Sequence, residues 1–271
     1  MRRRQFLLSA GAGVVAGSSA VVGGRLRTGS DGGDGDDEEI EDPRGGTQQI
    51  VWSVDHGAPV AALTFDDGPH PELTPRILEV LDRYGVRATF MAMGYAAQRH
   101  PSLVAEIVAA GHEVGHHGWR HLNLAKVSAA TTRKEIEIGA QAVEDAAGVP
   151  VRLFRPPRGR LSESAVRLLA GLRHDIILWS VTRGRKRWRS PDLVARHVVD
   201  ETGPGAIIDL HDGIGRGTFV PHSALASSLL DRRAVEVEAL PRLIEGCGEK
   251  GVELTTVSEL RGATLRPGTL G

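Results

Sequence analysis

Two histidines four residues apart, His117 and His121, and the adjacent carboxylates Asp66 and Asp67 are well suited to binding a metal ion. If the histidines lie on a helix, a spacing of four places them on one face, where both imidazoles can reach the same ion. One of the carboxylates would complete a site of two histidines and one carboxylate. Such a site leaves coordination positions open for water and substrate, as catalytic zinc requires. The pattern therefore predicts a metal-dependent hydrolase.

Spacing alone does not identify the ligands. His112 and His116 are also four residues apart, and the chain holds 11 histidines in all. Without a histidine pair nearby, Asp66 and Asp67 would equally well form an acidic turn that caps the next helix. Three further stretches carry residue types suited to chemistry: Arg155-Pro156-Pro157, Trp179 with Trp188, and Leu210-His211-Asp212.

The elements that must position these residues alternate between strands and helices from Ile50 onward. A strand is predicted at Val60–Phe65, and a helix with one apolar face follows at Thr74–Tyr84. The same patterns predict strands at Ala88–Met93, Leu153–Arg155, Ile176–Val181, Ala206–His211 and Leu254–Val257, and helices at Ser102–Ala110, Ala129–Ala147, Ser162–Ala170, Asp192–Asp200 and Ala234–Glu249. This alternation predicts an α/β fold with a parallel sheet, and its length favours a closed or nearly closed barrel. Chemistry in such folds lies at the carboxyl ends of the strands, where Asp66, Arg155 and His211 are expected.

Length and composition limit the class of protein. The 271 residues can form one full catalytic domain, which we place at residues 50–265. With 33 basic and 34 acidic residues, the chain has no charge excess of the kind that nucleic-acid binding needs. Cys247 is the single cysteine, which excludes an internal disulfide and a cysteine-based metal site.

The first 49 residues are expected to lie outside the fold. Residues 1–24 combine paired arginines with a mild apolar run, which is typical of a twin-arginine export signal. Whether this segment is cleaved or remains as a membrane anchor is left open by its small-residue pattern, and it is the one membrane contact we expect. Residues 25–49 are acidic and glycine-rich, so we expect a disordered linker rather than a calcium-binding tail.

Several motifs together resemble the polysaccharide deacetylases, the NodB-homology family of carbohydrate esterases. The similarity runs from about Val60 to Leu260 and includes Thr64-Phe65-Asp66-Asp67-Gly68-Pro69, His117-Gly118-Trp119-Arg120-His121, Arg155-Pro156-Pro157, Gly111-His112-Glu113-Val114-Gly115 and Thr256-Val257-Ser258-Glu259-Leu260. The resemblance implies a distorted (β/α) barrel with fewer than eight regular strands. It also implies removal of acetyl groups from N-acetylhexosamines in chitin or peptidoglycan, or from O-acetylated sugars such as xylan.

The resemblance assigns metal binding to Asp67, His117 and His121, with one divalent ion that we expect to be Zn²⁺. It makes Asp66 the general base that takes a proton from water, a task that a carboxylate outside the coordination sphere can perform. It makes His211 the general acid that protonates the leaving group.

The remaining site residues follow from the same resemblance. Arg155 would pair with the base, and the amide after Pro157, that of Arg158, would hold the oxyanion. Trp188 and Leu210 would contact the substrate.

Two departures from the family pattern concern the general acid. In the family, the carboxylate partner of the acid histidine is an Asp that precedes a tryptophan in the fourth motif. The fourth motif here is the stretch with Trp179 and Trp188, and Arg187 precedes Trp188. Asp209, in turn, stands where the family has a Leu that lines the acetyl pocket. Alternate residues of a strand share a face, so Asp209 and His211 lie on the same side. Asp209 could supply the missing partner, pair with an arginine, reshape the pocket for a more polar acyl group, or mark a weakened enzyme.

The leading interpretation is an exported, monomeric, metal-dependent hydrolase of an acetylated glycan. A carbohydrate-binding descendant with little activity and an amide hydrolase acting on a non-sugar substrate are the alternatives. The basic run from Arg183 to Arg189 is either a solvated cluster or a surface that attracts an anionic glycan.

Overall fold

The structure is a computed structural model that describes residues 48–54, 58–185 and 188–263. The expected export signal, most of the expected linker and Arg187 lie outside the described residues. Within the described part, no helix combines the length and the apolar character that crossing a membrane requires.

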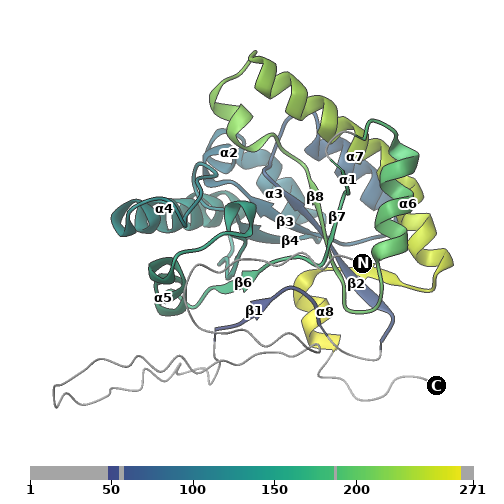
Figure 1. The fold of residues 1–271 in the computed structure, drawn as a ribbon, viewed down its shortest axis with the longest axis horizontal. Helices are drawn as coiled ribbons and strands as arrows, with labels where there is room; N and C mark the ends of the chain where they lie inside the picture. Colours follow the sequence, from purple (N-terminus) through teal and green to yellow (C-terminus); the bar gives the residue numbers. More distant parts are fainter. Residues whose placement is uncertain (1–47, 55–57, 186–187, 264–271) are drawn as a thin grey trace.

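One sheet forms the centre of the described residues (Figure 1). Its strands are β1 (Ile50–Val51), β2 (Val60–Asp66), β3 (Thr89–Ala92), β4 (Glu113–His116), β5 (Leu153–Phe154), β6 (Asp175–Ile177), β7 (Val181–Thr182), β8 (Ile207–His211) and β9 (Glu253–Thr255). The order is β1-β6-β5-β4-β3-β2-β8-β7, with β9 also pairing with β2, and neighbouring strands run parallel. The sheet curves into a barrel that stays open between its end strands β1 and β7, as the sequence predicted.

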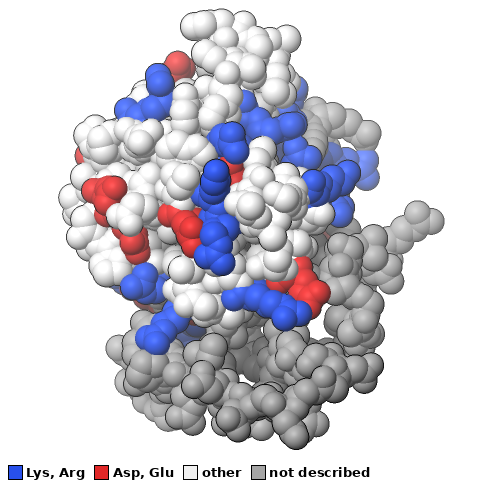
Figure 2. All heavy atoms as spheres, turned by 90° about the vertical axis from the view of Figure 1, so that its left-hand side faces the viewer, with Lys and Arg blue, Asp and Glu red and all other residues white. Residues whose placement is uncertain are grey.

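Helices flank the strands, with α4 and α5 on one side and α6 and α7 on the other (Figure 1). Their bounds are α1 (Thr74–Tyr84), α2 (Gly94–Arg99), α3 (Pro101–Ala109), α4 (Ala129–Ala147), α5 (Glu163–Gly171), α6 (Pro191–Glu201), α7 (Ala224–Glu249) and α8 (Val257–Ala263), with short 3₁₀ turns at η1 (Pro157–Gly159) and η2 (Gly215–Phe219). Acidic and basic side chains lie next to one another on the face with α4 and α5 (Figure 2), where Arg133 pairs with Glu137.

Alternation along β2 separates the core from the site. Leu63 and Phe65 pack outward into the cluster that joins the sheet to the helices, together with Ile208 of β8. Ala62 packs inward with Ile207 into a smaller cluster inside the barrel. The period of two therefore turns Thr64 and Asp66 inward as well.

The observed elements agree with most of the predicted ones, and α1 and α4 have the predicted bounds. Helix α7 begins earlier than predicted, at Ala224, where the hydroxyl of Ser223 accepts a bond from the Ala226 amide. The strand predicted at Ile176–Val181 is two strands, β6 and β7. Between them the Leu178 amide donates to Val51 and the Ser180 amide to Ile207, so the chain crosses from one edge of the open barrel to the other.

Candidate active site

The acidic pair lies at the carboxyl end of β2, beside β8. Asp66 and His211 are register partners on these strands, and both are turned into the barrel. Asp67 follows in a left-handed conformation, with φ 75°. Its carboxylate packs against Gly215, where a Cβ atom would lie 2.8 Å from Oδ1, so a side chain there would displace the carboxylate. The strand end and the glycine together hold Asp67 toward the mouth.

His117 and His121 converge as predicted, but the helical face that we expected to bring them together is absent. Both lie in the loop after β4, in which Gly118 has φ 76° and His121 has φ 58°. The loop is hydrogen-bonded to adjacent segments: the His117 amide donates to the Ala92 carbonyl, and the Gly118 carbonyl accepts from the Gly94 amide. Left-handed residues and these bonds replace the i→i+4 bonds of a helix.

Three donor atoms meet between this loop and Asp67. Nε2 of His121 lies 3.3 Å from Asp67 Oδ1, and Nε2 of His117 lies 3.8 Å from the same oxygen. All three ligand atoms lie within 4.8 Å of one another. Asp67 Oδ1 is buried and has no hydrogen-bond partner among the described residues.

The surroundings fit a metal ion at this point. Nδ1 of His117 donates to the Arg155 carbonyl at 2.7 Å, which orients Nε2 toward the other two ligand atoms, as second-shell bonds do in zinc sites. Burial acts to raise the pKa of Asp67, but His121, His211 and Arg233 outweigh it and lower that pKa, so the carboxylate stays ionised. Two imidazoles and a carboxylate with an unpaired buried oxygen are the donor set of a catalytic zinc site.

Arg155 fixes the other carboxylate. It is fully buried, and its Nη1 donates to Asp66 Oδ1 at 2.7 Å and to Thr64 Oγ1 at 2.6 Å. The carbonyls of Ile177 and Leu178 accept the remaining guanidinium bonds. The guanidinium also lies 5.7 Å from the centre of the Trp179 ring. Arg155 thus joins β5, β2 and the segment after β6 around Asp66.

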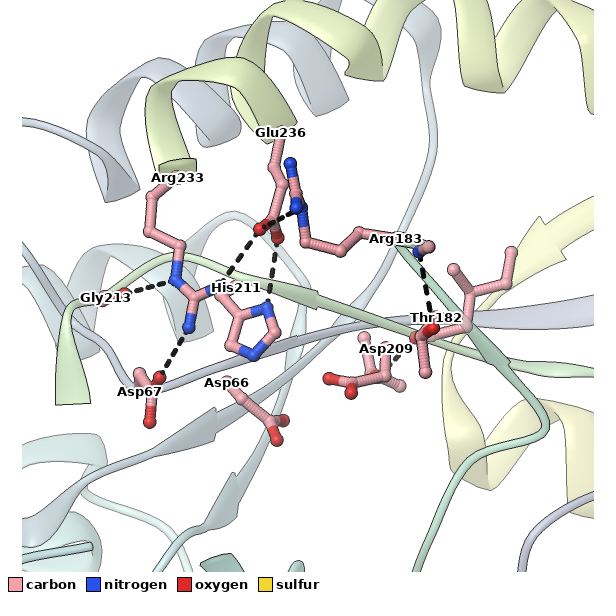
Figure 3. A network of polar contacts seen from close by, with 12 residues as sticks. Asp66, Asp67, Thr182, Arg183, Asp209, His211, Gly213, Arg233 and Glu236 are labelled. Carbon is pink, nitrogen blue, oxygen red and sulfur yellow. Dashed lines mark hydrogen bonds and ion pairs between the residues drawn. The ribbon is translucent and has the colours of Figure 1, made fainter. Parts of the chain in front are cut away.

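His211 receives its carboxylate partner from α7 (Figure 3). Its Nδ1 lies 3.0 Å from Glu236 Oε2. Glu236 Oε1 in turn lies 3.0 Å from Arg233 Nη1 and 2.8 Å from Arg183 Nε, and Arg233 Nη2 donates to Asp67 Oδ2 at 3.0 Å. Burial and Arg233 act to lower the pKa of His211, but Glu236 and Asp209 prevail and the pKa is raised. The partner expected from Asp209 is therefore Glu236, and Asp209 adds its charge through space.

Asp209 lies on the inner face of β8 and is buried beside Arg155, whose Nη1 is 3.9 Å from its Oδ1. That oxygen has no hydrogen-bond partner among the described residues. The sequence thus placed Asp209 on the face of His211 correctly, although the hydrogen bond to the imidazole comes from elsewhere.

The predicted substrate contacts divide into two groups. Pro157 and Arg158 lie beside the histidine loop: a Cβ on Gly118 would lie 3.9 Å from Pro157 Cγ, and Arg158 acts electrostatically on His121. Leu210 does not join them, because the alternation of β8 turns it outward into the core with Leu63.

Trp188 does not reach the centre either. It packs against α6, with its ring 5.2 Å from that of His197. Trp179, which the sequence reasoning left without a role, lies closer, since it faces Arg155 and a Cβ on Gly159 would lie 3.1 Å from its ring.

Glu236 and Arg233 were also missed. Arg183, which the sequence analysis placed in an exposed basic run, is instead buried and pairs with Glu236. Arg233 and Glu236 are three apart on the face of α7 that otherwise carries Leu240 and Leu243 into the core. Charged residues at core positions of an amphipathic helix would have been the signal, because burying them is costly unless they are paired.

Comparison with known proteins supports the resemblance found in the sequence. Residues 53–176 match the family described as Polysaccharide deacetylase. The chain is 31% identical to a peptidoglycan-N-acetylglucosamine deacetylase of Bacillus cereus over 216 residues, covering 79% of this chain and 93% of the relative. It is 34% identical to a chitooligosaccharide deacetylase of Sinorhizobium fredii over 212 residues, covering 77% and 91%.

The fold has a counterpart among solved structures. The crystal structure of a peptidoglycan N-acetylglucosamine deacetylase, bound to a hydroxamate-type benzamide, superposes with a TM-score of 0.69 at 29% identity. The match covers 78% of this chain and 92% of that one.

Proposed function

The chain belongs to the polysaccharide deacetylase family, and from this we propose that it is an exported, metal-dependent hydrolase that removes acetyl groups from N-acetylated glycans. The convergence of Asp67, His117 and His121 next to Asp66 and His211 carries this proposal. Hydrolysis of an amide requires a metal site, a carboxylate that does not bind the metal, and a histidine, all facing one space.

Asp67, His117 and His121 would hold one divalent ion, with zinc the expected one. When bound, such an ion lowers the pKa of a coordinated water and polarises the acyl oxygen.

Asp66 would accept the proton that the attacking water loses. Arg155 holds Asp66 Oδ1 at 2.7 Å, and Oδ2 lies 3.7 Å from Nε2 of His117, so this oxygen faces the proposed ligands. An oriented carboxylate beside the proposed ligands can take a proton from a water held at that site.

His211 would donate a proton from Nε2 to the leaving nitrogen. Because Glu236 accepts the hydrogen on Nδ1, the second proton of the imidazolium points away from Glu236, toward the site. The raised pKa keeps more of His211 protonated at neutral pH. The backbone N–H of Arg158 would donate to the developing oxyanion, and its role does not depend on the side chain.

The proposed substrates are those of the relatives, peptidoglycan or chito-oligosaccharides, with O-acetylated glycans as a further class. Export by the twin-arginine route would place the enzyme in the cell envelope or outside the cell, where such glycans occur. The twin-arginine pattern of residues 1–24 supports this route.

The proposal is tested by acetate release. Purified protein is stripped with a chelator, reloaded with Zn²⁺, and assayed on peptidoglycan, chito-oligosaccharides and acetylxylan. We expect acetate from at least one N-acetylated glycan, lost on chelation and restored by zinc. If zinc-loaded protein binds these glycans but releases no acetate, the chain is instead a carbohydrate-binding descendant. The loss of activity would then be attributed to the altered fourth motif.

A further inference from the structure

Asp209 is a polar residue of the inner barrel that the proposed reaction does not use directly. It pairs in register with Thr64 of β2, just as His211 pairs with Asp66, and lies one inward position deeper. Figure 3 shows its carboxylate turned toward the space that Asp66 and His211 also face. The side chain keeps 8% of its surface exposed, so it forms part of the floor of that space.

The polar neighbours of Asp209 are already engaged. The Thr64 hydroxyl accepts from Arg155 and donates to the carbonyl of Ile208. Arg155 donates its hydrogen bonds to Asp66, Thr64 and backbone carbonyls. Its Nη1 lies 3.9 Å from Asp209 Oδ1, which is too far for a hydrogen bond. Asp209 Oδ1 therefore stays without a hydrogen-bond partner among the described residues.

A buried carboxyl oxygen without a hydrogen bond is costly, which points to a partner that arrives with the substrate. Burial and the charge of Asp66 raise the pKa of Asp209 to about 7, a further sign that its surroundings do not satisfy the charged form.

The acyl group is the part of the substrate that can meet Asp209. Asp66 and His211 must both reach the scissile amide, so that bond lies between them, at the ends of β2 and β8. The sugar chain is too large to enter the barrel and must stay at the mouth. The acyl substituent, on the other side of the carbonyl, then points inward, toward the exposed part of the Asp209 side chain.

We propose that Asp209 lines the acyl pocket and selects an N-acyl group with a hydroxyl next to the carbonyl, so that the preferred substrate is an N-hydroxyacetyl glycan rather than an N-acetyl one. This inference rests on the proposed deacylase function. Hydrolysis would break the amide C–N bond, with water supplying the hydroxyl to hydroxyacetate and a proton to the free amine.

The pairing works in both protonation states of Asp209. As a carboxylate it accepts the hydrogen of the acyl hydroxyl, and as a carboxylic acid it donates to the oxygen of that hydroxyl. The methyl group of an acetyl substituent can do neither and leaves the carboxyl unpaired. Sites built to bond a substrate hydroxyl discriminate strongly against the analogue that lacks it.

The test compares kcat/KM for N-hydroxyacetyl and N-acetyl forms of the same chito-oligosaccharide, using zinc-loaded protein. We expect the wild type to favour the hydroxyacetyl form by about tenfold, the ratio that one hydrogen bond typically supplies. Asp209→Leu should reverse the preference toward acetyl, whereas Asp209→Asn, which can still bond a hydroxyl, should retain the preference for hydroxyacetyl. A ratio of two substrates on one protein is insensitive to partial loss of folded enzyme.

The possible results distinguish failure of this inference from failure of the proposed deacylase function. If the wild type releases acetate at least as efficiently as hydroxyacetate, the inference is overturned and the deacylase function stands, whatever the variants do. The inference also fails if Asp209→Leu leaves the ratio unchanged. Release of neither acid by the zinc-loaded wild type would overturn the proposed function itself.

Discussion

Glu236 and His211 come from different layers of the fold, yet Oε2 of one lies 3.0 Å from Nδ1 of the other. Glu236 reaches inward from α7, and His211 ends β8. Arg183 and Arg233 hold the second carboxylate oxygen, so the position of Glu236 is determined from three directions. The contact fixes the orientation of the imidazole and directs Nε2 into the site.

Replacing Glu236 with Gln should move the alkaline limb of the pH–rate profile to lower pH. The carboxylate of Glu236 raises the pKa of His211, while burial and Arg233 lower it. Without the negative charge the pKa of His211 falls, and the protonated acid is lost at a lower pH. The measurement is kcat/KM between pH 6 and 10 with zinc in excess.

Glu238→Gln is the matched control, because Glu238 lies on the same helix but is exposed. Glu238→Gln should leave the alkaline limb of the pH–rate profile at the wild-type pH. An alkaline limb that is identical in Glu236→Gln and wild type would show that Glu236 does not set the protonation of the acid. The charge of Asp209 also acts on His211, so the shift in Glu236→Gln should be incomplete.

Mutations should distinguish the proposed general base from the proposed metal ligands. Asp66→Asn removes the proposed proton acceptor but none of the three converging ligand atoms, so turnover should fall by at least about a hundredfold while about one equivalent of metal remains. His117→Ala removes a ligand and should lose both metal and turnover. Metal analysis alongside acetate release distinguishes them. Full metal content in His117→Ala, or metal loss in Asp66→Asn alone, would reverse the assignment.

Local sequence patterns predicted the fold and the end of the sheet at which the candidate site lies. Alternating strands and helices predicted the parallel, barrel-like sheet, and the strand ends located Asp66 and His211, which the register now pairs. These features depend on periodicity within a few residues, which the sequence shows directly. The period of two also placed Asp209 on the face of His211.

Contacts between distant elements could not be predicted in the same way. Glu236 replaces the missing fourth-motif carboxylate from a helix 25 residues beyond His211, and no local pattern specifies that approach. The histidine spacing suggested a helix, but left-handed Gly118 and His121 form a loop that achieves the same convergence. The resemblance implies a substrate contact for Leu210, but the strand alternation that turns Asp209 inward turns Leu210 outward into the core.

Arg233 should strengthen metal binding although it touches no metal. It donates to Asp67 Oδ2 at 3.0 Å, which leaves Oδ1 facing the two histidines, and a second bond to the Gly213 carbonyl fixes the guanidinium. Arg233→Met should lower metal affinity by about 10- to 100-fold, as losing a second-shell partner commonly does. Competition with a zinc-sensitive chelating dye measures the affinity. Arg232→Met, at the half-buried neighbouring position, is the control, and equal affinities in the two variants would contradict the role of Arg233.

Acid should destabilise the fold through His116. This side chain is fully buried against Phe154 and His174, and neither ring nitrogen has a hydrogen-bond partner among the described residues. Burial, together with His174 and His117, holds the pKa of His116 well below 6.5. The unfolded chain therefore binds a proton that the folded one excludes. The stability contribution is complete above pH 6.5 and is lost as pH falls, by about 1.4 kcal/mol per pH unit.

Asparagine does not titrate in this range, so His116→Asn should show a shallower loss of unfolding free energy between pH 7.5 and pH 5. Urea denaturation in the presence of chelator measures it without a contribution from bound metal. His222→Asn, at an exposed position, is the control and should follow the wild-type slope. If His116→Asn also keeps the wild-type slope, the acid sensitivity of the fold comes from another buried group, with His174 the next to test, since burial lowers its pKa as well.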